Sequence, residues 1–212
     1  MHVSAGTVKS VHSHILSMDC EKLKRELGDL SPERRFECLN NWAVTGKTAL
    51  GYYAAIGSPD PSDKPCPVFE LLIKYGADPS VRCGSGLTPL IICCTRTDLA
   101  GSRKHMQSKI VGMLLSLHDC GVDVAVDARE SIEDCTALLV ALASGEHASK
   151  SSNELIRRRI NIDSRCYPRE AKGSTLWGTC DQGETPLMMC VRMEDEKSLK
   201  KLLEVKLSTP KP

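Results

Sequence analysis

Cysteine and histidine are the residue types of this sequence best suited to chemistry, with 11 cysteines and 6 histidines among its 212 residues. A zinc site would gather them at short spacings such as C-x-x-C or H-E-x-x-H, and the sequence contains neither. Cys93 and Cys94 are adjacent, so their side chains would diverge on a helix. We therefore expect no metal site and no cofactor, and we expect most histidines at the surface or at helix caps.

The cysteines could instead form disulfides or supply a reactive thiol. The odd number of cysteines argues against a disulfide framework, as does a first segment, M-H-V-S-A-G-T-V-K-S, that lacks the apolar core of a signal peptide. We therefore expect a cytoplasmic or nuclear protein with reduced thiols. A catalytic thiol needs a basic neighbour, which the sequence cannot place. Cys66, next to Pro67 at an expected helix start, is the best candidate for a lowered pKa.

Charge and motif content argue against several other classes of function. The chain has 28 Lys and Arg against 27 Asp and Glu, so no basic excess supports binding to nucleic acid or to an acidic membrane surface. The longest segment without a charged residue, Cys83 to Thr95, has 13 residues and is too short to cross a bilayer. The segment C-G-S-G at 83–86 lacks the strand and the lysine of a phosphate-binding loop, and no G-x-S-x-G or dinucleotide fingerprint occurs. We expect no enzyme.

Four segments of the chain open in the same way. The letters T-A-L or T-P-L begin at Thr48, Thr88, Thr136 and Thr185, followed by small or aliphatic residues. A second phrase comes later, as in V-F-E-L-L-I-K-Y-G-A-D, I-V-G-M-L-L-S-L-H-D-C-G-V-D and S-L-K-K-L-L-E. Together these phrases resemble the ankyrin repeat, whose consensus opens T-P-L-H-x-A-A and closes V-V-x-L-L-L-x-x-G-A-D. The resemblance implies an all-α solenoid of about five antiparallel helix-pair repeats, with atypical caps, inserted loops and protruding connections called fingers.

The repeated letters also have a physical meaning. A threonine hydroxyl caps a helix by accepting a hydrogen bond from an amide of the first turn, and proline suits the first helical position. The leucines at 50, 90, 138 and 187 are expected to point into the layer between neighbouring units. Gly76 and Gly121 fit left-handed helix C-caps. Because no pair can bury its apolar face alone, we expect stability to come from stacking.

The spacing of the four threonines predicts long insertions. They are 40, 48 and 49 residues apart, whereas the ankyrin period is about 33. The surplus falls in S-P-D-P-S-D-K-P, around T-D-L-A-G-S-R-K-H-M, and in a long third finger that contains Tyr167 and Trp177. We expect one domain over 7–204, with an N-terminal capping repeat plus an extra helix at 7–45, repeats at 46–85, 86–133 and 134–183, a C-terminal capping repeat at 184–204 and a tail at 205–212.

Both ends of the domain are expected to cap the stack. Apolar residues at helical spacing from Val8 to Ile15 predict a first helix, and Asp19 fits the N-cap of a second. Ser31 fits the N-cap of an extra helix with Phe36 and Leu39 on one face. The final helix is expected to have a polar outer face formed by Lys197, Lys200, Lys201 and Glu204.

Most cysteines are expected to pack rather than react. The two positions that the consensus fills with alanine hold Tyr53 and Ala54, Cys93 and Cys94, Ala141 and Leu142, and Cys190 and Val191. Cysteine at such a position is a small buried apolar residue. The consensus histidine, which in the family links neighbouring fingers by hydrogen bonds, is replaced by Gly51, Ile91, Leu139 and Met188. We therefore expect this scaffold to depend more on apolar contact.

The resemblance implies a non-enzymatic module that binds a partner protein, as a regulator or an adaptor. In the family, partners dock on the concave face formed by the finger tips and the exposed side of the first helices. The third finger is the sharper candidate, because tryptophan, tyrosine and arginine dominate binding hot spots. Carried onto this sequence, the candidate partner-binding residues are Tyr52, Ile56, Arg82, Ser85, Leu87, Thr95, Arg96, Ala143, Ser144, Tyr167, Trp177, Arg192 and Met193.

Three alternatives stay open at this point. A thiol-based redox or regulatory protein would have one cysteine far more reactive than the others. A structural homodimer could form through the insertions, although we expect a monomer. The letters R-R-R at 157–159 fit either contact with an acidic partner or cations that complement a helix C-terminus.

Overall fold

The computed structural model describes residues 3–57, 67–95, 103–130, 134–167 and 181–208. Within those ranges the chain forms eleven α-helices and one short 3₁₀-helix, η1 (Gly145–Ala148), and no strand. The predicted all-α class is confirmed. The α-helices are α1 (Ala5–Leu16), α2 (Cys20–Gly28), α3 (Pro32–Asn40), α4 (Ala49–Ile56), α5 (Pro67–Lys74), α6 (Pro89–Cys94), α7 (Arg103–Asp119), α8 (Ala137–Ala143), α9 (Ser149–Arg157), α10 (Pro186–Arg192) and α11 (Glu196–Leu207).

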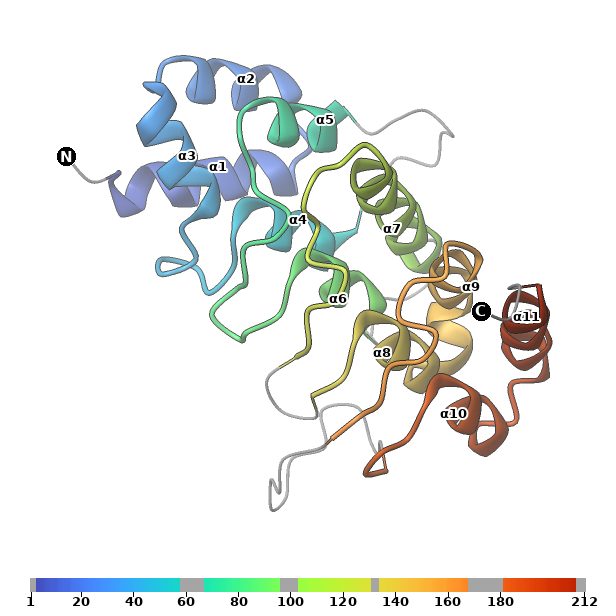
Figure 1. Cartoon of the computed structure of the whole chain (residues 1–212). Coiled ribbons are helices and arrows are strands. Elements are labelled where there is room, and N and C mark those ends of the chain that lie inside the picture. The colour runs from blue at the N-terminus through green and yellow to red at the C-terminus, as the bar shows by residue number, and fades with distance from the viewer. Residues whose placement is uncertain (1–2, 58–66, 96–102, 131–133, 168–180, 209–212) are drawn as a thin grey trace.

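The helices pack as successive pairs along an elongated molecule (Figure 1). Within pairs, α1 contacts α2, α4 contacts α5, α6 contacts α7, α8 contacts α9, and α10 contacts α11. The first helices also contact one another in chain order, from α1 through α4, α6 and α8 to α10. A second row runs beside them, in which α7 contacts α9 and α9 contacts α11. The extra helix α3 packs on α4 and α1 at the N-terminal end.

The expected threonine caps form at three of the four repeat openings. The hydroxyls of Thr48, Thr88 and Thr185 accept hydrogen bonds from the backbone amides three residues later. Thr136 makes no such cap, and its hydroxyl instead lies 3.0 Å from the hydroxyl of Ser164. The prediction was therefore wrong for Thr136, because a partner on the next connecting segment takes the hydroxyl that the motif assigns to the helix.

The core lies between the two rows of helices. Leu50, Leu90 and Leu138 are buried as expected, whereas Leu187 is only half-buried. The cysteines at alanine positions, Cys93, Cys94 and Cys190, are also buried. Val191 holds the last alanine position but is 64% exposed. The motif alone therefore does not ensure burial; a neighbouring pair must also cover it.

The N-terminal cap agrees with the prediction at most positions. Val8, Val11 and Ile15 are fully buried on one side of α1. The side chains of Asp19 and Ser31 cap α2 and α3. Phe36 was expected beside the buried Leu39, but it is 53% exposed because α3 turns only its Cys38–Leu39 side to the core.

The turns after two second helices have the predicted left-handed glycines. Gly76 has φ +95°, and the next amide, of Ala77, donates to the Leu72 carbonyl across the helix end. Gly121 has φ +86°, and the amide of Val122 donates to the Leu117 carbonyl in the same way. Both helix ends are closed by the hydrogen bonds that this backbone geometry allows.

Candidate functional site

The connecting segments between pairs place three arginines at one repeated position. In each segment the residue after the arginine pairs its backbone with the residue before the next threonine. The amide of Cys83 donates to the Leu87 carbonyl, and the amide of Glu130 donates to the Cys135 carbonyl. Cys166 likewise donates to Glu184. Arg82, Arg129 and Arg165 precede these paired residues, and we call them the arginine row.

Hydrogen bonds join the arginine row from one segment to the next. Nη1 of Arg82 lies 2.7 Å from the Arg129 carbonyl oxygen, and Nη1 of Arg129 lies 2.7 Å from that of Arg165. Arg129 also donates to the carbonyl and the carboxylate of Asp134. We expected the scaffold to depend more on apolar contact; the structure adds that arginine side chains link successive connecting segments by hydrogen bonds.

At Gly51, the first of the four positions where the resemblance would place histidine, the structure gives a packing reason for a glycine. A Cβ atom on Gly51 would lie 2.5 Å from Sγ of Cys83 and 3.1 Å from the hydroxyl of Thr48. Cys83 comes from the following connecting segment and is buried. Its sulfur therefore occupies the space next to the helix where the consensus side chain would begin.

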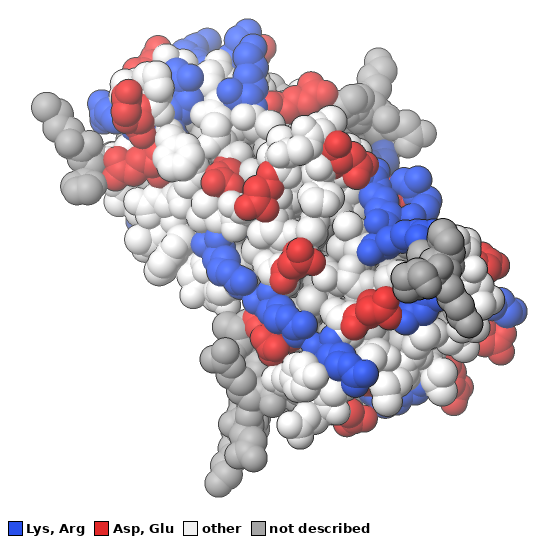
Figure 2. All heavy atoms as spheres, viewed as in Figure 1, with Lys and Arg blue, Asp and Glu red and all other residues white. Residues whose placement is uncertain are grey.

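The arginine row is accessible from outside. Arg82 and Arg165 are exposed, and the side chain of Arg129 is 35% exposed. Figure 2 shows a diagonal line of Lys and Arg side chains across the face on which the connecting segments lie, with acidic side chains beside it. Within the described chain the guanidinium of Arg165 has no hydrogen-bond partner. This face offers cationic donors at a repeated spacing.

The predicted binding residues on the first helices are less accessible than expected. Tyr52 is half-buried, with its ring stacked on His12 at a centroid distance of 4.6 Å. Ile56 is also half-buried. Thr95 is buried, and its hydroxyl donates to the Ile92 carbonyl. Ser144 is buried and donates to the Cys94 carbonyl. The prediction of a binding role was wrong for Thr95 and Ser144, because both hydroxyls are used inside the fold.

Some of the predicted residues on the connecting segments are exposed, and others are used in interactions within the chain. Ser85 is exposed and Leu87 half-buried, and both lie beside Arg82 in the chain. Tyr167 is 49% exposed, two residues after Arg165. Arg192 forms a two-point ion pair with the buried carboxylate of Glu184, with N–O distances of 2.7 and 3.0 Å, and so holds the last connection. The other predicted positions are the half-buried Ala143 and the exposed Met193, together with Arg96 and Trp177, which lie outside the described residues.

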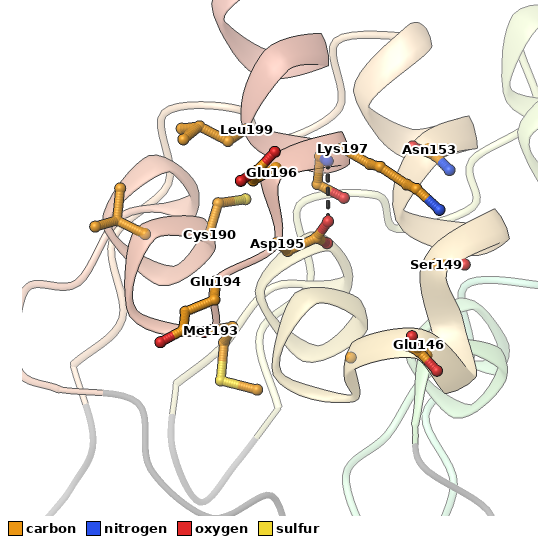
Figure 3. A pocket seen from close by; sticks show the side chains of 13 residues that line it. Glu146, Ser149, Asn153, Cys190, Met193, Glu194, Asp195, Glu196, Lys197 and Leu199 are labelled. Carbon is orange, nitrogen blue, oxygen red and sulfur yellow. Dashed lines mark hydrogen bonds between the residues drawn. The ribbon is translucent and has the colours of Figure 1, made fainter.

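An open groove of about 910 Å³ lies at the C-terminal end of the molecule (Figure 3). One wall comes from η1 and α9, with Glu146, Ser149 and Asn153. The other wall comes from α10 and the turn into α11, where the carboxylate of Asp195 caps α11 by accepting from the Ser198 amide. Its lining mixes charged, polar and apolar groups.

The cluster at 157–159 is largely paired within the chain. α9 ends at Arg157, so these cations do lie at a helix C-terminus. Arg157 and Arg158 both bind the carboxylate of Glu154, and Arg158 also pairs with Asp119 on α7. The hydrogen bond from Arg157 lowers the pKa of Glu154. The structure favours the helix-end interpretation over a partner contact.

Comparison with known proteins adds no identity. No protein-family model matches the chain, and no similar sequence was found among curated proteins. Among the helices of the described ranges, none has the length and apolar character needed to span a membrane. In the same part of the chain, no group of three His, Cys, Asp or Glu side chains is arranged to hold a metal ion.

The buried thiols of Cys38, Cys94 and Cys190 are packing groups. Burial raises the pKa of Cys38 to about 11 and of Cys94 and Cys190 to about 12. A thiol with so high a pKa carries almost no thiolate at neutral pH and is a poor nucleophile. Cys66, the candidate for a lowered pKa, lies outside the described residues.

Two features were missed in the sequence. His12 is buried rather than at the surface, and neither ring nitrogen has a partner among the described residues; burial and the charge of Lys47 lower its pKa to about 4. The sulfur atoms of Cys135 and Cys166 lie 2.8 Å apart, although the two residues are 31 positions apart in the sequence. The sequence held a signal for the contact between Cys135 and Cys166. Cys135 directly precedes a repeat threonine and Cys166 directly follows an arginine of the row, which are the two paired positions of the connecting segments.

Proposed function

We propose that this chain is an ankyrin-type solenoid that binds a partner protein and catalyses no reaction. Three observations support the proposal: the repeated T-A-L or T-P-L openings, the successive helix pairs, and the contacts of the first helices in chain order. Solenoids of this kind bind along an extended surface made by equivalent positions of successive repeats. We place the protein in the cytoplasm or the nucleus, as a monomer.

The observation that carries the proposal is the arginine row. Arg82, Arg129 and Arg165 present guanidinium groups from three successive connections, and Tyr167 lies exposed at the end of the row. Arginine and tyrosine are enriched at binding hot spots. A partner that follows the row would be an extended segment with acidic side chains, because carboxylates pair with guanidinium groups in two-point geometry.

Direct binding tests this assignment. The probe is a fluorescently labelled peptide that alternates Glu with Gly, compared with its Gln counterpart. We expect the acidic peptide alone to bind, with an affinity that falls as salt increases. The double variant Arg82→Gln/Arg165→Gln should weaken binding at least about fivefold.

The matched control removes two exposed cations far from the row, as Lys24→Gln/Lys197→Gln, and changes the net charge equally. Equal loss in both double variants would show attraction to net charge only, and would reject the row as the site. Because Arg82 also links two segments, circular dichroism and Tm must show that its variant remains folded.

The third finger provides a second test of the same proposal. Trp177→Ala should leave the helical circular dichroism unchanged and weaken capture of the partner from a lysate. Unchanged capture would remove Trp177 from the site and leave the arginine row to be judged by the peptide experiment.

The two alternatives make different predictions. A protein with one reactive regulatory thiol would show one cysteine alkylated much faster than the others in native conditions. A homodimer would show a mass in light scattering that doubles as the concentration rises.

A further inference from the structure

Two buried cysteine sulfur atoms lie in contact at the base of the last two connections. Sγ of Cys135 and Sγ of Cys166 are 2.8 Å apart, and both residues are fully buried. A disulfide bond is about 2.05 Å long, so the sulfurs are in contact but not bonded. Less than 1 Å of approach separates this contact from a bond.

The backbones on both sides of this contact are held in register. The Cys135 carbonyl accepts from the Glu130 amide, and the Cys166 amide donates to the Glu184 carbonyl. Next to the sulfurs, the hydroxyls of Thr136 and Ser164 lie 3.0 Å apart. The side chain of Arg129 reaches the Arg165 carbonyl. The fold therefore keeps the two thiols together without any bond between them.

We propose that Cys135 and Cys166 are an oxidative modification site at which hydrogen peroxide converts the two thiols into a disulfide. One thiolate attacks the peroxide, and its sulfur becomes a sulfenic acid as one water leaves. The second thiol then attacks that sulfur, the S–S bond forms, and the sulfenic oxygen leaves as a second water. Overall, two thiols lose two hydrogens and two electrons, and one peroxide is reduced to two waters.

The consequence of the bond follows from what lies between the two cysteines. The segment between Cys135 and Cys166 contains α8, η1 and α9, so the bond would close one complete helix pair into a covalent loop. Closing a loop of this length restricts the unfolded chain and stabilises the folded one. Because both sulfurs are buried, reaction requires local opening and is slower than at the exposed Cys120.

The other described cysteines give internal controls. Cys93 and Cys94 are buried neighbours in α6, and Cys120 is exposed after α7. Cys190 packs in α10. The site is therefore defined by the contact between two sulfurs rather than by the burial or exposure of one.

Oxidation of the reduced, folded chain by hydrogen peroxide tests the proposal. After remaining thiols are blocked with N-ethylmaleimide, tryptic mapping should show peptide 130–150 joined to peptide 166–169, two hydrogens lighter than their sum. Tm should rise by about 5 to 10 °C and return to its starting value with dithiothreitol.

Single variants complete the test. Cys135→Ser and Cys166→Ser should each abolish the bridge and the rise in Tm, whereas Cys120→Ser should retain both. If both thiols remain alkylatable after peroxide has oxidised Cys120, the proposal is wrong. It is equally wrong if Cys166 joins a different cysteine. The wild-type mapping decides the question even if a serine variant fails to fold.

Discussion

The first helices α6 and α10 open with the same three letters, T-P-L, and yet differ in how they are buried. Every residue of α6 is buried, from Pro89 to Cys94. In α10 only Pro186, Met189 and Cys190 are buried, and Met188 is 58% exposed. The helix α6 contacts two other first helices, α4 and α8, whereas α10 contacts one, α8, besides its own partner α11.

The comparison shows that the same letters give both segments a capped helix, whereas the burial of each helix depends on its neighbours. Both helices are capped by their threonine, through the amides of Ile91 and Met188. The predicted polar face is present on α11, where Lys197, Lys200, Lys201 and Glu204 are exposed. The neighbouring α10 instead leaves Met188 and Val191 exposed. The polar capping face expected at the end of a solenoid is thus formed by only one helix of the last pair.

The largest effect should come from the same substitution in the two helices. Leu90→Ala removes a fully buried side chain and should lower the free energy of unfolding by about 3 to 4 kcal/mol. Leu187→Ala removes its half-buried equivalent and should cost about 1 kcal/mol. Urea denaturation followed by circular dichroism measures both values. Equal losses would contradict the view that neighbouring pairs decide burial.

The N-terminal end of the molecule allows a second test of the effect of burial, through the pH dependence of stability. α1 is also a terminal helix, but α3 and α4 pack on it and its His12 is buried. Burial lowers the pKa of His12 to about 4, whereas the unfolded chain titrates near 6.5. Between these two pH values the unfolded state binds more protons than the folded state. The free energy of unfolding should therefore fall by about 2 to 3 kcal/mol as the pH drops from about 6.5 to 4.

His12→Phe provides the control for this pH dependence. Phenylalanine keeps a ring against Tyr52 and cannot be protonated. The variant should show a flatter stability profile between pH 6.5 and 4 than the wild type. An unchanged slope would mean that another group causes the acid sensitivity.

A smaller difference in stability should distinguish alanine substitution at a closely packed glycine from the same substitution at a glycine with open space around it. Gly51→Ala places a Cβ against the buried Cys83 sulfur and should destabilise the protein by about 1 to 2 kcal/mol. Gly112→Ala, in the middle of α7 with nothing within 4 Å, should stabilise it by about 0.5 to 1 kcal/mol. If Cys83→Ala does not relieve the loss at Gly51, then the contact with sulfur is not its cause.

The smallest effect should come from the arginine row. Arg129→Gln removes side-chain hydrogen bonds to Asp134 and to the Arg165 carbonyl, and should cost about 1 kcal/mol because the guanidinium is partly screened by solvent. Arg25→Gln, at an exposed position of α2, is the control for loss of a charge. The midpoints of chemical denaturation of the two variants, measured under the same conditions, test this prediction. Identical midpoints would deny Arg129 a structural role.

Local features could be predicted where one short segment contains the whole interaction. The caps of Asp19, Ser31, Thr48 and Thr88 need only a hydroxyl or carboxylate and an amide three residues later. The glycine ends at 76 and 121 need only their own backbone conformation. Features that depend on a second segment were missed, as with Thr136, whose hydroxyl faces Ser164.

Part of the candidate surface could be predicted and part could not. Arg82 was proposed from the finger positions that the resemblance implies, and Tyr167 because it is an aromatic residue in the long third finger; both are exposed in the structure. The link from Arg82 to Arg129 spans 47 residues, and insertions of irregular length hide the equivalence of Arg82, Arg129 and Arg165. Thr95 and Ser144 were misjudged because a hydroxyl in sequence does not show whether a carbonyl inside the fold accepts from it.

The amino-acid sequence by itself predicted the all-α class, through the resemblance of its repeated phrases, and it determined side-chain caps such as those of α4 and α6, because a cap depends only on local spacing and side-chain type. The tertiary structure alone decided which helix faces are covered and that Cys135 lies against Cys166. It alone also decided that His12 is buried and that the arginine row is continuous. These properties depend on groups that come from distant parts of the chain, and the distance between two residues in the sequence does not show how close they lie in space.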